Sequence, residues 1–127
     1  MARRQTIELD GFAHGNPIPV AVRIGNMVYT GGVAGTNEAG QTPEDPDEQI
    51  GQVFKNLQRI VEAAGGTVAD IAKIDVKLRD MSHRAIVNKH WLAMFPDEHD
   101  RPARHTTQGD LPGSLVIQVE MVAVLEA

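Results

Sequence analysis

The 127-residue sequence contains no cysteine, so a disulfide framework, a thiolate nucleophile and a cysteine-based zinc site are all excluded. Aromatic residues make up only 4% of the chain. Its 12 basic residues are outnumbered by 17 acidic ones, which gives a net charge of −5. Because nucleic-acid binding depends on clustered basic and aromatic side chains, we expect no nucleic-acid partner.

Long apolar runs are also missing, and none approaches the roughly 20 residues that a membrane helix needs. The first ten residues alternate polar and apolar side chains and have no apolar core of a signal peptide. We therefore expect a cytoplasmic protein that has no membrane partner. Histidines are present, but they do not show a metal-ligand spacing such as HExxH, so no metal site is expected; they include His83, His90, His99 and His105.

The chain is 42% hydrophobic and 23% charged, which is typical of a single globular domain over residues 1–127. Its clearest pattern predicts a helix from about Pro46 to Ala64. Asp45 is a suitable N-cap, and Gly65-Gly66 provides a left-handed end. The apolar stripe of this helix follows the i, i+3, i+4, i+7 rule and consists of Ile50, Val53, Phe54, Leu57, Ile60, Val61 and Ala64.

A second helix is predicted from Ser82, as its N-cap, to Phe95, where Pro96 ends it. Between the two helices, residues 73–80 alternate strictly and predict a strand with one buried face. Its two faces consist of Ile74, Val76 and Leu78 on one side and Lys73, Asp75, Lys77 and Arg79 on the other.

Further strands are expected at Thr6–Leu9, Val20–Ile24, Met27–Val33 and Ser114–Leu125, with a hairpin turn at Gly25-Asn26. A polar loop, Gly35–Asp45, precedes the first helix, and its acidic end suits a helix N-terminus. The fold class is therefore α+β, with two helices packed on one face of a mixed sheet.

Glu120 is a carboxylate within an otherwise apolar strand, where an unpaired charge is costly if it is buried. One interpretation is that its face of the strand is partly solvated, or that it pairs with a lysine or arginine. The other is that it is held in a pocket as a base or as a group that orients water.

Arg104 lies in a short extended segment that follows Pro102. Strand geometry places Arg104 and Thr106 on one face and His105 on the opposite one. The guanidinium suits a substrate carboxylate, which it would bind through two parallel hydrogen bonds. A surface arginine in an ion pair is an equally good interpretation of the spacing alone.

Several motifs occur in a fixed order along the chain. They are Gly25–Gly32, Ile60–Gly65, Val87–Trp91, Arg101-Pro102-Ala103-Arg104, Leu111-Pro112 and Val116–Ala123. Together they resemble the RidA/YjgF family, also called the endoribonuclease L-PSP family, over nearly the whole chain from Asn16 onward. The resemblance implies a chorismate-mutase-like α+β fold, a homotrimer with ligand sites between subunits, and no cofactor. It also implies a hydrolase that deaminates 2-imino or enamino carboxylic acids to 2-oxo acids and ammonia.

By the same resemblance, Arg104 binds the substrate carboxylate, Glu120 orients a water molecule, and Asn88 and Gly31 line the pocket. The sequence departs from the family pattern at three positions that we expect near the substrate. Gly31 replaces a serine, Ile18 a tyrosine and Thr106 a cysteine, and His14 could supply a substitute polar group.

These departures leave several functions open. The leading one is deamination of an imino or enamino acid. The alternatives are a specialised deaminase of aromatic catabolism, such as a 2-aminomuconate deaminase, and a non-catalytic binder of a carboxylate ligand. An endoribonuclease is a weaker alternative, because the net charge of −5 disfavours RNA binding.

Overall fold

The apolar stripe around residues 46–64 forms helix α1, Pro46–Ala63, in a computed structural model that describes residues 2–12 and 16–126. The Asp45 carboxylate accepts a hydrogen bond of 3.0 Å from the backbone N–H of Glu48. At the other end, Gly65 adopts a φ of 99°, and the N–H of Gly66 donates to the carbonyl of Val61 at 2.9 Å. Both predicted ends of the helix are confirmed.

The second helix, α2, spans Arg84–Met94, and the prediction that Ser82 caps it is wrong. The cap lies earlier, because the Asp80 carboxylate accepts a hydrogen bond of 2.9 Å from the backbone N–H of Ser82. This bond places Ser82 inside a short 3-10 helix, η2 (Met81–His83), from which α2 continues. A second 3-10 helix, η1 (Val68–Asp70), follows α1.

Six strands of the described chain form one mixed sheet in the order β1-β2-β3-β6-β4-β5. All neighbours are antiparallel except β4 and β5, which are parallel. The hairpin between β2 and β3 turns at Gly25, whose φ of 58° confirms the predicted turn. The strands are β1 Gln5–Ile7, β2 Ala21–Ile24, β3 Met27–Thr30, β4 Ile71–Leu78, β5 Ala103–Gln108 and β6 Ile117–Val124.

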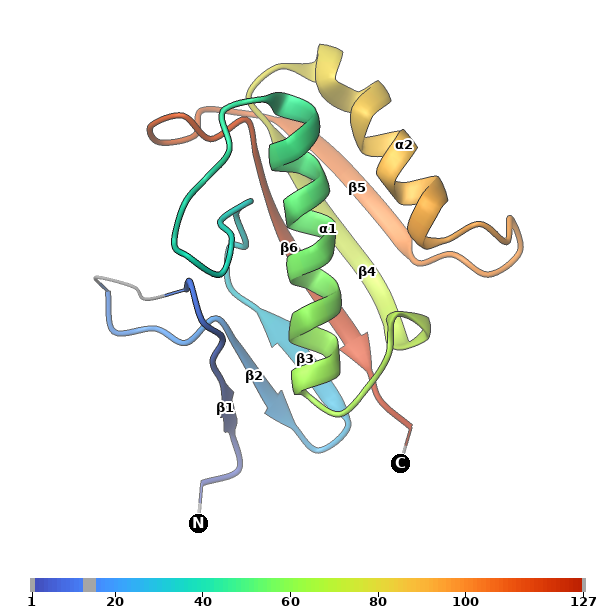
Figure 1. The fold of residues 1–127 in the computed structure, drawn as a ribbon. Coiled ribbons are helices and arrows are strands. Elements are labelled where there is room, and N and C mark those ends of the chain that lie inside the picture. The colour runs from blue at the N-terminus through green and yellow to red at the C-terminus, as the bar shows by residue number, and fades with distance from the viewer. Residues whose placement is uncertain (1, 13–15, 127) are drawn as a thin grey trace.

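Both helices lie on the same side of the sheet, with α1 across its middle and α2 next to β5 (Figure 1). We call the covered side the helix face; it carries the buried Ile74, Val76 and Leu78 of β4. No helix of the described residues covers the opposite side, which we call the open face. It carries Asp75 and Lys77. The predicted alternation of this strand is therefore confirmed.

The last strand starts three residues later than expected, at Ile117 instead of Ser114. Gln49, a fully buried residue of α1, accounts for the difference. Its side chain accepts a hydrogen bond of 2.7 Å from the N–H of Val116 and donates one of 3.2 Å to the carbonyl of Ser114. These backbone groups bond to the helix instead of a neighbouring strand. Among the described residues, no helix is long and apolar enough to cross a membrane.

Candidate functional site

Arg104 lies on β5 in register with Ile74 of β4, so its side chain belongs to the helix face. Its Nη2 donates a hydrogen bond of 2.7 Å to Oδ1 of Asn88, and its Cζ lies 4.9 Å from the ring centroid of Trp91. Asn88 and Trp91 are three residues apart on α2, which puts them on one face of that helix. The helix therefore holds the guanidinium by one edge and one face, and the cation is positioned before any ligand binds.

The surroundings of Arg104 favour an anionic ligand. Burial and then the nearby charge of Arg84 lower the pKa of Arg104 below its ordinary value. No described carboxylate forms an ion pair with it, so the interpretation of Arg104 as half of a surface ion pair is not supported. A shallow depression of about 320 Å³ opens beside the guanidinium and is lined by Asn88, Trp91, Leu92 and Arg104.

Glu120 is exposed at the middle of β6, on the open face. It pairs in register with Asp75 of β4, which in turn pairs with His105 of β5, so the three side chains form a row across three strands. Within the described chain, Glu120 has no ion-pair partner, and its face is solvated as one interpretation of the sequence expected. It lines a second depression, of about 370 Å³, with Asp75, Lys77, His105, Thr107 and Gln118.

Arg104 and Glu120 consequently point to opposite faces of the same sheet. Arg104 shares the helix face with Ile74, whereas Glu120 shares the open face with Asp75, the next residue of β4. One copy of the chain does not bring the guanidinium and the carboxylate to one ligand. Any site that uses both must take them from two copies.

The other expected site residues lie at two places in the single chain: Thr106 is on β5 with Arg104, whereas Gly31 and Ile18 both lie next to Pro19. Thr106 is half-buried on the same face as Arg104. Gly31 directly follows β3, and its N–H donates to the carbonyl of Val20 at 3.0 Å. A Cβ at this position would lie 3.9 Å from the carbonyl oxygen of Pro19 and 4.0 Å from that of Val20. Ile18 is 53% exposed and lines a depression near the N-terminal segment. His14 falls outside the described residues.

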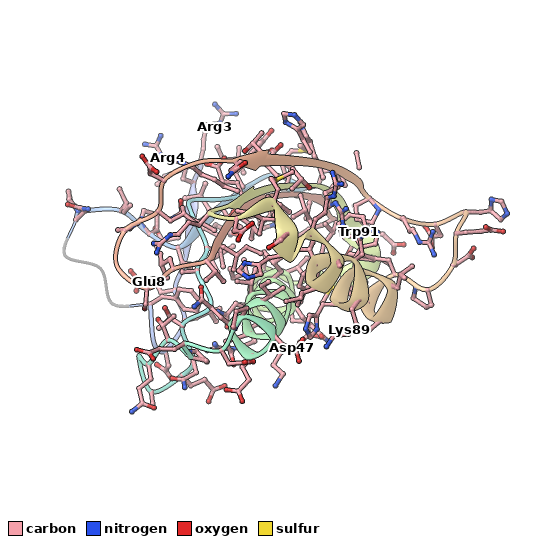
Figure 2. All side chains as sticks on the ribbon, turned by 90° about the horizontal axis from the view of Figure 1, so that it is seen from above. Arg3, Arg4, Glu8, Asp47, Lys89 and Trp91 are labelled. Atoms are coloured by element: carbon pink, nitrogen blue, oxygen red, sulfur yellow. The ribbon has the colours of Figure 1, made fainter. Side chains whose placement is uncertain are left out.

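Trp91 is a site residue whose contact with Arg104 the sequence interpretation missed. A tryptophan at helical spacing is usually part of a core, and Trp91 is indeed only 8% exposed and packs edge-on against Phe95. Figure 2 shows it on the side of α2 that faces the sheet, whereas Lys89 points toward Asp47 of α1. The sequence does contain one signal of this contact: Trp91 lies three residues after Asn88, which places both on one face of a helix.

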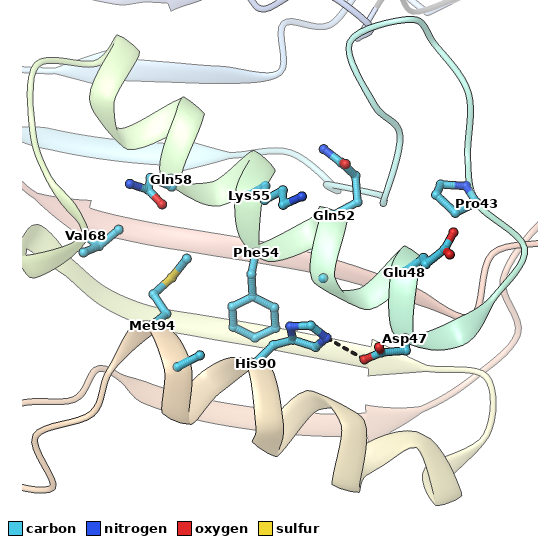
Figure 3. A pocket seen from close by; sticks show the side chains of 12 residues that line it. Pro43, Asp47, Glu48, Gln52, Phe54, Lys55, Gln58, Val68, His90 and Met94 are labelled. Carbon is cyan, nitrogen blue, oxygen red and sulfur yellow. Dashed lines mark hydrogen bonds and ion pairs between the residues drawn. The ribbon is translucent and has the colours of Figure 1, made fainter.

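Another depression, of about 690 Å³, contains neither Arg104 nor Glu120 and lies between α1 and α2. There Oδ1 of Asp47 lies 2.8 Å from Nε2 of His90 (Figure 3). The same oxygen also pairs with Lys89. Hydrogen bonds from Lys89 and His90 lower the pKa of Asp47. The His90 ring stacks on Phe54 at 6.0 Å. These contacts join α2 to the first turn of α1.

Comparison with known proteins decides the family. A family model described as Endoribonuclease L-PSP matches residues 13–126. The chain belongs to this family, the RidA/YjgF family. The 2-iminobutanoate/2-iminopropanoate deaminase of Escherichia coli K12 is 36% identical over 111 residues, which cover 85% of this chain and 87% of that protein.

Two solved structures extend the match to the fold. RidA from the Antarctic bacterium Psychrobacter superposes with a TM-score of 0.84 at 32% identity, covering 98% of this chain and 100% of that one. E. coli TdcF with bound serine superposes with a TM-score of 0.85 at 29% identity, covering 96% and 99%. The expected chorismate-mutase-like α+β fold is confirmed.

Proposed function

We propose that this protein hydrolyses 2-imino or enamino carboxylic acids to 2-oxo acids and ammonia. One observation carries the proposal: Asn88 and Trp91 hold a partly desolvated Arg104 guanidinium for which no described carboxylate is a partner. A carboxylate-bearing substrate would supply the missing anion through charge-assisted hydrogen bonds. The E. coli relative named as an imine deaminase supports the choice of reaction.

The proposed reaction adds water across the C=N bond. Glu120 orients a water molecule toward C2 of the imine and accepts its proton as the oxygen forms a bond to that carbon. Glu120 passes this proton to the imine nitrogen, which gives a tetrahedral carbinolamine. The hydroxyl proton is then transferred to the amine nitrogen, again through Glu120, as the C–N bond breaks, and the products are a 2-oxo acid and ammonia. Arg104 contributes by fixing the carboxylate, and therefore C2, beside the water.

We also infer that the working unit is a homotrimer with sites between subunits. Arg104 lies on the helix face and Glu120 on the open face, so a shared site needs an arginine from one copy and a glutamate from another. The open face also exposes Tyr29 (45%) and Val124 (40%), which are apolar surfaces that a second copy would cover. Repetition of such a head-to-tail contact closes into a ring when its rotation permits.

The test is ammonia release from freshly generated 2-iminopropanoate or 2-aminoacrylate. We expect the wild type to accelerate it, and Arg104→Ala and Glu120→Ala each to lower kcat/KM by about 10²-fold or more, the usual size of such single contributions. Full activity of Glu120→Ala alongside loss in Arg104→Ala would exclude water activation but leave the carboxylate clamp in place. No acceleration by the wild type would exclude the proposed reaction.

A non-catalytic carboxylate binder is the second candidate, and the crystal structure of TdcF with bound serine supports it because serine carries a carboxylate. Tight binding of a 2-oxo acid without imine hydrolysis would favour this candidate. Activity confined to 2-aminomuconate would favour the specialised catabolic deaminase. RNA cleavage that persists through repeated purification would favour the endoribonuclease, against which the net charge of −5 counts.

A further inference from the structure

Gln118 is a polar residue of β6 that lies two positions before Glu120. Residues i and i+2 of a strand share one face, with Cβ atoms about 7 Å apart, so both side chains belong to the open face. Gln118 is half-buried, Glu120 is exposed, and both line the depression of about 370 Å³. Among the described residues, none forms a hydrogen bond with the Gln118 amide. The proposed reaction leaves this amide without a role.

The strand pairing beside Glu120 is irregular. The register between β3 and β6 shifts by one residue beyond the end of β3, before the bridge that joins Val33 to Val119. Gly31 and Gly32 therefore stand together opposite the single residue Glu120. Two residues opposite one is the arrangement of a β-bulge, a feature that commonly redirects side chains next to active sites.

The Gln118 side chain packs over this bulge. A Cβ at Gly32 would lie only 2.9 Å from Cδ and from Nε2 of Gln118, so the missing side chain of Gly32 provides the room for the amide. Because Gly32 stands opposite Glu120, the Gln118 side chain leans along β6 toward that carboxylate. A free amide and a free carboxylate are thus brought to one end of the same depression.

A water molecule that attacks C2 of an imine must direct a lone pair at the carbon, so each of its two hydrogens needs an acceptor. Glu120 accepts one of them. The amide oxygen of Gln118 is suited to accept the other. The two acceptors of one water lie about 4–5 Å apart, which side chains of this length reach from Cβ atoms about 7 Å apart. Since an amide is neutral and not basic, it does not compete with Glu120 for the proton.

We propose that Gln118 is a further catalytic residue, which fixes the attacking water together with Glu120. This inference rests on the proposed imine hydrolysis. As the C–O bond forms, one proton of the water moves to Glu120, and the other hydrogen stays on the oxygen and remains bonded to Gln118. Gln118 therefore contributes to the orientation of the nucleophile and not to the binding of the substrate carboxylate.

The experiment measures kcat and KM for freshly generated 2-iminopropanoate, and Kd for pyruvate by calorimetry, in the wild type and in three variants. Gln118→Met keeps a long side chain over Gly32 but has no amide oxygen. Gln118→Glu keeps an acceptor oxygen at the same reach. Gln5→Met is the matched control, because Gln5 is exposed on the edge strand β1 and lines neither the Arg104 nor the Glu120 depression.

We expect Gln118→Met to lower kcat about 10- to 100-fold, with KM for the imine and Kd for pyruvate within about twofold of the wild type. Gln118→Glu should keep at least about five times the kcat of Gln118→Met, and Gln5→Met should match the wild type. A wild-type kcat in Gln118→Met, or an equal loss of imine turnover and pyruvate binding, would overturn the assignment of Gln118 and leave imine hydrolysis in place. A Gln118→Glu no more active than Gln118→Met would do the same.

The double variant Gln118→Met/Glu120→Ala shows whether the two side chains hold the same water. Its kcat/KM is expected within about threefold of that of Glu120→Ala, because the single variant has already lost the ordered water. Two losses that multiply would overturn the shared water. A wild type that does not accelerate imine hydrolysis would overturn both this assignment and the proposed function.

Discussion

Replacing Asn88 by aspartate tests the role of Arg104 with almost no change of shape. In the wild type, Oδ1 of Asn88 accepts a hydrogen bond of 2.7 Å from Nη2 of Arg104 and contributes no net charge. In Asn88→Asp the same oxygen position carries a negative charge, so the guanidinium gains an internal carboxylate partner. The substrate carboxylate would then bind a cation that is already neutralised.

The size of the effect follows from the repulsion between the two carboxylates. At a separation of about 5 Å and an effective dielectric constant between 20 and 80, it amounts to about 0.8–3 kcal/mol. Asn88 is exposed and salt screens such charges, so about 1–2 kcal/mol is the reasonable range. We therefore expect KM for 2-iminopropanoate, and Kd for a 2-oxo acid, to rise about five- to thirtyfold. The kcat is expected to stay within about threefold, because the water-orienting Glu120 is not altered.

The matched control is Asn88→Ala, which removes the hydrogen bond but leaves the charge of Arg104 available to a ligand. Its KM is expected to rise less than that of Asn88→Asp, by about fivefold at most, since a neutral hydrogen bond contributes about 1 kcal/mol. Steady-state kinetics and calorimetry measure both variants, and thermal unfolding verifies that Asn88→Asp is folded. Equal KM values for the two variants would show that Arg104 does not bind the substrate carboxylate.

Two further predictions concern stability. Asn56 is fully buried, and its amide donates to the carbonyls of Ala34 (2.9 Å) and Thr36 (2.8 Å). Asn56→Ala should therefore lower the free energy of unfolding, measured with urea, by about 2–4 kcal/mol. A decrease below about 0.5 kcal/mol would contradict this prediction. The pKa of Asp47 is lowered in the folded state, so the ionised carboxylate stabilises the fold at neutral pH. This contribution to the free energy of unfolding is lost as the pH falls through the lowered pKa. Asp47→Asn should therefore lower Tm at pH 7 and converge with the wild type in acid, whereas a constant difference down to pH 2 would be inconsistent with the linkage.

Local sequence signals account for most of the fold. Asp45, the apolar stripe and Gly65 define α1 within one residue, because capping and helical periodicity depend on near neighbours. The alternation in β4 also predicts correctly which side chains are buried. The misplaced cap of α2 has a local cause too, since Asp80 competes with Ser82 for the same role.

The arrangement of the candidate site depends on contacts that local patterns do not contain. Strand periodicity separates Arg104 from His105, but the relation of Arg104 to Glu120 depends on how β5 and β6 both pair with β4. The stacking of Arg104 on Trp91 likewise depends on α2 packing beside β5. The family resemblance named Arg104 and Glu120 as candidates. Their opposite orientations could not be predicted, because they depend on these long-range pairings.

In the proposed trimer, one site takes Arg104 from one copy and Glu120 from another. Mixed assemblies of Arg104→Ala and Glu120→Ala, purified through a different tag on each variant, test it directly. A cyclic trimer that contains both variants has one interface at which an intact arginine meets an intact glutamate, so we predict about one third of the wild-type activity per trimer. Mixed assemblies as inactive as the two parent variants would contradict the claim.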